Sequence, residues 1–203
     1  MAPNHPQSLT VTRRFDFPME RVFDAWLDPT RVGKWLFATP TGTIVRADID
    51  ARVGGGFIIT DRRDGEDVEH VGTYLEIDRP RRLAFTFGVP QYSELMTHVR
   101  IDLRPVPGGC ELTLTQQDTP AEWVERARDG WGKIIGALSS HLAEEAKYAV
   151  RVEPGTVRLE RVLPGPIERQ HPNMAIQWPQ FLQRQIGVRQ TQRRLRRGKR
   201  SSQ

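Results

Sequence analysis

The sequence predicts an α+β fold in which one curved antiparallel sheet of about seven strands wraps around a long C-terminal helix. Six segments between residues 43 and 117 alternate apolar and polar residues, as half-buried strands do. Residues 119–147 then carry apolar side chains at spacings of three and four, which predicts a helix with one apolar face. Loops this short join antiparallel strands, because a parallel crossover needs about a dozen residues or more.

A first strand and two short helices precede these six segments. Residues 9–17, LTVTRRFDF, alternate apolar and polar side chains, and Pro18 ends the predicted strand. Residues 18–28, PMERVFDAWLD, place apolar side chains at i, i+3, i+4, i+7 and i+8, which predicts an amphipathic helix. Residues 29–36, PTRVGKWL, predict a second short helix.

Turn-forming residues separate most of the six later strand segments. Gly54, Gly55 and Gly56 connect two of them, and we interpret these glycines as a turn. A phosphate-binding loop would need a following helix and a Lys-Ser/Thr pair, and neither occurs there. The strand segments are TIVRADI, GFIITDRR, HVGTYLEI, RLAFTFGV, THVRIDLRPV and CELTLTQQ.

The predicted C-terminal helix has a marked start and a wide apolar face. Thr119 can cap its first turn, and Pro120 suits its first helical position. Its apolar stripe from Trp123 to Leu142 is the only element long enough to cover the apolar faces of the strands. A sheet that curves strongly around one helix tends to leave a cavity between them.

The net charge of +5 is unevenly distributed along the 203 residues. Residues 1–150 hold 18 Lys and Arg against 22 Asp and Glu, whereas residues 151–203 hold 12 against 3. We therefore expect a flexible N-terminus over residues 1–8, one domain over residues 9–148 and a basic tail over residues 149–203. Nucleic acid is not an expected partner, because only the tail is basic and its Arg-rich end lacks interleaved aromatic residues.

The tail contains an echo of the first strand. Residues 157–169, VRLERVLPGPIER, align with residues 9–21, LTVTRRFDFPMER, at six matched positions. Two interpretations stay open: a truncated or frame-shifted second copy of the domain, or chance similarity between two strand starts.

Composition also bears on compartment and cofactors. No apolar run approaches the roughly 20 residues of a membrane span, and the N-terminus lacks the features of a signal peptide, so we expect a soluble, cytoplasmic protein. The single cysteine, Cys110, excludes an intramolecular disulfide and a cysteine-rich zinc site. The histidines show no metal-ligand spacing, so neither a metal nor a cofactor is expected.

Several stretches, taken with the order of elements, resemble a known family. They are FDFPMERVFDAWLDPTRVGKWLF, GGGFIITDRRDG, VGTYLEIDRPRRLAFTF, ELTLTQQ and DGWGKIIGAL. Over about residues 9–146 the chain is similar to the activator of Hsp-90 ATPase homologue-like family of the START-like, Bet v-type SRPBCC superfamily. The resemblance implies a helix-grip fold with a hydrophobic internal pocket, often in small bacterial proteins, and it implies no single reaction.

Apolar and aromatic residues on the sheet and its covering helix are candidates to line such a pocket, although each could instead fill the core. The candidates are Trp35, Phe57, Ile59, Tyr74, Phe85, Phe87, Met96, Trp131, Ile135 and His141.

His141 has two interpretations. It follows Leu138 by three residues, near the apolar stripe, where an imidazole could donate to a ligand or act as an acid or base. The alternative is a structural histidine. Ser139 and Ser140 adjoin it, but neighbours on a helix point apart, so no catalytic residue is assigned.

The leading hypothesis is a binding protein that holds a small lipophilic molecule between the curved sheet and the C-terminal helix, without a cofactor. Two alternatives stay open. One is a chaperone accessory protein, implied only by the family name, that binds through its outer surface. The other is an enzyme of the cyclase, aromatase or hydrolase kind, with Tyr74 or His141 positioning the substrate. A homodimer is also considered.

Overall fold

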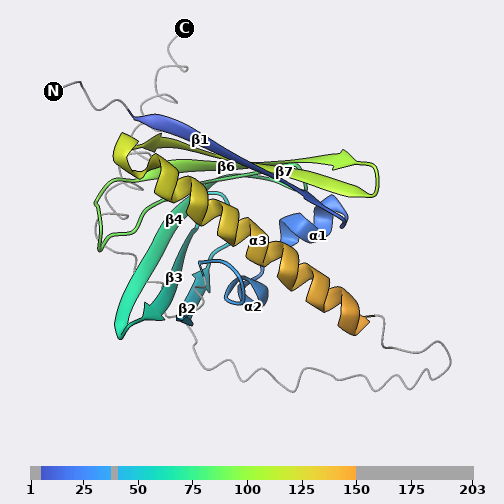
Figure 1. The fold of residues 1–203 in the computed structure, drawn as a ribbon, viewed down its shortest axis with the longest axis horizontal. Coiled ribbons are helices and arrows are strands. Elements are labelled where there is room, and N and C mark those ends of the chain that lie inside the picture. The colour runs from blue at the N-terminus through green and yellow to red at the C-terminus, as the bar shows by residue number, and fades with distance from the viewer. Residues whose placement is uncertain (1–5, 38–40, 150–203) are drawn as a thin grey trace, which may run out of the picture. The chain divides into compact units, whose positions relative to one another are not determined.

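The computed structural model describes residues 6–37 and 41–149 and confirms the predicted fold (Figure 1). Contacts divide the chain after Lys147, and the fold described below is that of the first unit. Its elements in chain order are β1 (Gln7–Phe15), α1 (Met19–Asp24), α2 (Pro29–Val32), β2 (Thr43–Ile49), β3 (Gly56–Arg63), β4 (Glu66–Asp78), β5 (Arg82–Phe87), β6 (Thr97–Val106), β7 (Gly109–Thr119), a 3₁₀ turn (Ala121–Trp123) and α3 (Val124–Ala149).

All seven strands form one antiparallel sheet in the order β1-β7-β6-β5-β4-β3-β2. β4 is the longest strand, and its pairing with β5 shifts register between Tyr74 and Glu76. Such a shift bends a strand and increases its twist. Gly72 lies just before it, where an added Cβ would collide with the Thr86 carbonyl oxygen, so only glycine permits this close approach. The sheet is therefore curved, with one concave face.

α3 crosses the concave side of this sheet (Figure 1). Its inner stripe of Ile135, Leu138 and Leu142 is fully buried, and so are Leu112 and Leu114 on β7. Burial of side chains of this size stabilises the fold by roughly 1.5–3 kcal/mol each. The predicted covering role of the helix is confirmed.

The predicted start of the helix is wrong. Thr119 pairs with Gln7 as the last residue of β7, and its buried hydroxyl makes no hydrogen bond to a helix N–H among the described residues. The chain instead makes a 3₁₀ turn after Pro120, and α3 begins at Val124. As a result Trp123, expected in the buried stripe, is 41% exposed.

α1 and α2 fill the concave side near the second half of α3. Trp26 and Trp35 pack edge to face there, with ring centroids 4.7 Å apart, and both are buried. Arg21 of α1 donates to the Leu142 carbonyl oxygen at 3.1 Å, and Arg31 of α2 forms an ion pair with Glu145. These contacts leave the first half of α3 as the part that the two short helices do not support.

No helix among residues 6–37 and 41–149 is long and apolar enough to cross a membrane. The expected basic tail, including the echo at residues 157–169, falls outside the described residues except for its first residue, Ala149.

Candidate functional site

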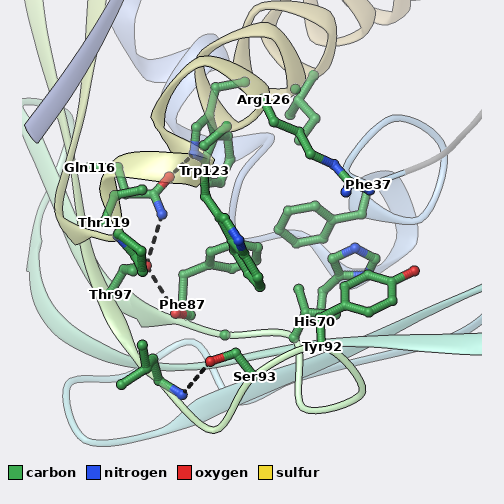
Figure 2. A pocket seen from close by; sticks show the side chains of 18 of the residues that line it. Phe37, His70, Phe87, Tyr92, Ser93, Thr97, Gln116, Thr119, Trp123 and Arg126 are labelled. Atoms are coloured by element: carbon green, nitrogen blue, oxygen red, sulfur yellow. Dashed lines mark hydrogen bonds between the residues drawn. The ribbon is translucent and has the colours of Figure 1, made fainter. Parts of the chain in front are cut away.

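A cavity of about 560 Å³ lies between the first half of α3 and the sheet (Figure 2). Its walls come from Phe37, from His70 of β4, from the end of β5 and the loop that joins β5 to β6, from the start of β6, the end of β7 and α3. The volume is within the range of about 300–1,000 Å³ that is usual for small-molecule sites. Its aromatic lining residues are Phe37, His70, Phe87, Tyr92, Trp123 and Trp131.

Three of these rings stand nearly parallel. The rings of Phe37 and His70 stack at a centroid distance of 4.2 Å and an interplanar angle of 5°. Phe87 lies 5.3 Å and 18° from Phe37 and 6.3 Å from His70, so Phe37 packs against both other rings. The indole of Trp131 is tilted against Phe37 and Phe87, at centroid distances of 5.9 and 5.4 Å. The three stacked rings of this inner wall therefore share a common plane orientation.

His70 takes part in this wall as a neutral ring. It is 8% exposed, and burial lowers its pKa from 6.5 to about 4, so the ring is uncharged at neutral pH. Its Nδ1 lies 3.3 Å from the Ile59 carbonyl oxygen, which can only accept, so we assign the proton to Nδ1.

A chain of hydrogen bonds crosses the floor of the cavity. The Trp131 Nε1 donates to Gln116 Oε1 at 2.5 Å, and Gln116 Nε2 donates to the Thr97 hydroxyl at 3.0 Å. That hydroxyl donates in turn to the Phe87 carbonyl oxygen at 3.0 Å. These polar groups therefore satisfy one another. The Thr119 hydroxyl differs, since it is buried without a hydrogen-bond partner among the described residues.

The cavity opens at a rim of exposed apolar side chains. Tyr92, Leu95 and Trp123 all line the cavity, yet each remains more than two-fifths exposed. Arg126 joins this rim from α3, one helical turn after Trp123. The site thus combines an apolar interior, a self-bonded polar floor and a rim that carries one guanidinium.

Two of the ten residues expected to line a pocket, Phe87 and Trp131, line this cavity. Met96 is partly buried, with its sulfur against Gly88, and does not line it. Six others fill the core, because the sheet, α1 and α2 close over them. They are Trp35, Phe57, Ile59, Tyr74, Phe85 and Ile135.

His141 lies outside the cavity, in a network that joins α3 to the short helices. Its Nε2 is 3.2 Å from Glu145 Oε1, and Glu145 also pairs with Arg31 and Arg21. Burial lowers the His141 pKa more than the nearby Glu145 carboxylate raises it. His141 therefore lies next to the Arg31–Glu145 ion pair and not at the cavity.

The sequence does not predict His70, Gln116 or Phe37 as cavity residues. Two of them could have been found, because His70 lies an even number of residues from the inward-facing Tyr74, and Gln116 alternates with the inward-facing Leu112 and Leu114. A polar residue at an inward-facing position of a strand indicates a possible site in both cases. Phe37 offered no such indication, because its place depends on a backbone φ of 59° that no periodicity reveals.

Metal binding lacks support in the described part of the chain. No three His, Cys, Asp or Glu side chains gather there as a metal site requires. The cavity itself contributes one imidazole and one guanidinium.

Comparison with known proteins gives a match over most of this unit. The family model described as "Activator of Hsp90 ATPase homolog 1-like protein" matches residues 16–143. None of the curated proteins with which the chain was compared matches it.

Solved structures share the fold. Protein CV1439 from Chromobacterium violaceum is 27% identical, with a TM-score of 0.60, over 68% of this chain and 96% of that one. The AHSA1-like protein from Aeromonas hydrophila is 20% identical, with a TM-score of 0.61, over 69% and 94%. CalU16 from Micromonospora echinospora is 23% identical, with a TM-score of 0.53, over 70% and 80%.

Proposed function

The chain belongs to the Activator of Hsp90 ATPase homolog 1-like family, and from this premise we propose that it binds a small, largely apolar molecule in the cavity between the sheet and α3. The observation that carries the proposal is the aromatic cavity of about 560 Å³. Well-packed protein interiors hold few voids larger than a water molecule. A space of this size therefore favours a bound ligand.

The chemistry of the lining favours binding over acid–base catalysis. His70 is the imidazole of the cavity, and a ring with a pKa of about 4 is a weak base at neutral pH. Its Nδ1 proton is engaged by Ile59. Gln116 and Thr97 are engaged with each other, so they are held as a floor rather than presented to a reacting group.

Two glycines on α3 give a matched pair of variants that tests the proposal. An added Cβ at Gly130 or Gly132 would meet no atom within 4 Å, but only Gly130 lines the cavity. Gly130→Leu should therefore fill part of the cavity, whereas Gly132→Leu leaves it open. Both changes raise helix propensity, by up to about 1 kcal/mol each, so both proteins should fold.

The measurement is mass spectrometry of small molecules extracted from natively purified protein. We expect a co-purifying molecule with the wild type and with Gly132→Leu, and its loss from Gly130→Leu. Equal recovery from both variants would place the molecule elsewhere on the chain. No molecule in any sample, together with no binding of added apolar probes, would contradict the proposal.

The same pair separates ligand binding from the chaperone-accessory alternative. A surface that docks on a bacterial Hsp90 does not include the interior of the cavity, so capture by Hsp90 should be equal for Gly130→Leu and Gly132→Leu. Hsp90 capture by both variants, without any small molecule in the wild type, would favour the chaperone role.

A further inference from the structure

We propose that the ligand is a planar aromatic carboxylate, whose rings stack in the cavity and whose carboxylate binds Arg126. This inference rests on the proposed function and names the class of molecule that the site selects. It follows from three features: the common orientation of the wall rings, the hydrogen bonding of the floor, and a guanidinium on the rim that makes no ion pair with any described residue.

The wall favours a flat ligand over a branched or globular one. Phe37, His70 and Phe87 lie within 18° of a common plane orientation. A planar ring system that lies parallel to these rings can extend their stack, and offset stacking adds about 0.5–1.5 kcal/mol per pair beyond the area buried.

Trp123 offers a second aromatic surface on the cavity. Figure 2 shows its indole among the side chains that line the cavity. No ring contact between Trp123 and another aromatic residue occurs among the described residues, and the side chain is 41% exposed. An indole left this open on a cavity gains contact area when a flat molecule enters beside it.

The floor does not provide for a charged end of the ligand. Gln116, Thr97 and the Trp131 indole are bonded to one another, and His70 is neutral. Moving a carboxylate against these groups would cost its hydration without an opposite charge to replace it. The apolar end of the ligand therefore belongs at the floor and its polar end at the rim.

Arg126 is the cation placed to receive that polar end. It lines the cavity, and Figure 2 shows its side chain extending towards Phe37. No hydrogen bond or ion pair of Arg126 is found among the described residues. By contrast Arg128, two residues on, lies 3.6 Å from the Glu125 carboxylate and donates to the Thr10 carbonyl oxygen at 3.4 Å. A guanidinium presents a planar fork that matches a carboxylate.

Calorimetric titration with two probes of the same ring system tests the inference. The probes are 2-naphthoate and the uncharged 2-naphthalenemethanol. We expect the wild type to bind 2-naphthoate roughly 5- to 10-fold more tightly than the alcohol, the range for one partly desolvated ion pair. Arg126→Gln should remove this preference, because it weakens binding of 2-naphthoate far more than binding of the alcohol. Higher salt should weaken binding of 2-naphthoate alone.

Arg128→Gln is the matched control, because it removes the same charge from the same helix outside the cavity lining. Equal loss of 2-naphthoate affinity in both variants would mean general electrostatic attraction and would overturn the inference. Equal binding of both probes by the wild type would overturn it too, while the proposed function would stand. Failure of the wild type to bind either probe would count against the proposed function as well as the inference.

Discussion

The indole Nε1 of Trp131 and the side-chain oxygen of Gln116 are 2.5 Å apart, in a hydrogen bond that ties α3 to β7 at the floor of the cavity. Trp131 is the residue at which the apolar stripe of α3 meets the cavity, and the bond fixes the plane of its ring. Because Gln116 also donates to Thr97, the bond belongs to a chain that ends on the backbone of β5. One polar side chain thus holds the shape of an otherwise apolar site.

Gln116→Leu is expected to destabilise the protein by roughly 1–3 kcal/mol, because it leaves the buried Trp131 N–H without a partner. Urea unfolding measures the change. Gln117→Leu is the control, since Gln117 is its exposed neighbour on the same strand. Equal stability of the two variants would show that the hydrogen bond contributes little.

His70 should make stability depend on pH. Its pKa is about 4 in the folded protein against about 6.5 in an unfolded chain, so below about pH 6.5 the unfolded state binds a proton that the folded state does not. Stability should fall as the pH drops from 6.5 to 4, by about 3 kcal/mol at most.

His70→Phe should flatten this part of the pH profile. Phenylalanine keeps a flat ring against Phe37 but takes up no proton. The free energy of unfolding of both proteins would be measured from pH 7 to pH 4. Profiles of identical slope would show that carboxylates, and not His70, control the acid dependence.

The fold could be predicted from the sequence because each strand has a period of two and each helix a period of about 3.6. Leu112 and Leu114 on β7, and Ile135 and Leu138 on α3, share burial for this reason. The same alternation places Gln116 on the inner face, so part of the site was within reach of the sequence.

The extent of the cavity could not be predicted from the sequence. Periodicity shows which side chains point inward, but it does not show where other elements fill the space between sheet and helix. Trp35 and Tyr74 are buried because α1, α2 and the bent β4 close around them. Trp123 is exposed because pairing of Thr119 with Gln7 delays the start of α3. Both outcomes are tertiary effects.

A chain shortened to residues 1–150 is expected to keep its cooperative unfolding and its thermal midpoint within a few degrees. The seven strands and their covering helix are complete by Ala149, and the ion pairs of Arg31 and Arg21 with Glu145 remain. Circular dichroism of the short and full-length chains makes the comparison. Loss of cooperative unfolding would show that residues after 150 belong to the same folding unit.

Trp131→Ala and Trp35→Ala should lower the free energy of unfolding by different amounts, although both side chains are almost fully buried. Trp35 packs against Trp26 in the closed part of the core, so its removal creates a new void and should cost roughly 3–5 kcal/mol. Trp131 already borders the cavity, so part of its surroundings is empty and less packing is lost. We expect a smaller cost, even with its hydrogen bond to Gln116 removed. Urea unfolding of the two variants without added ligand decides the point. A larger loss for Trp131→Ala than for Trp35→Ala would mean that the cavity around Trp131 is closed in solution, and the site would then have to open before a ligand could enter.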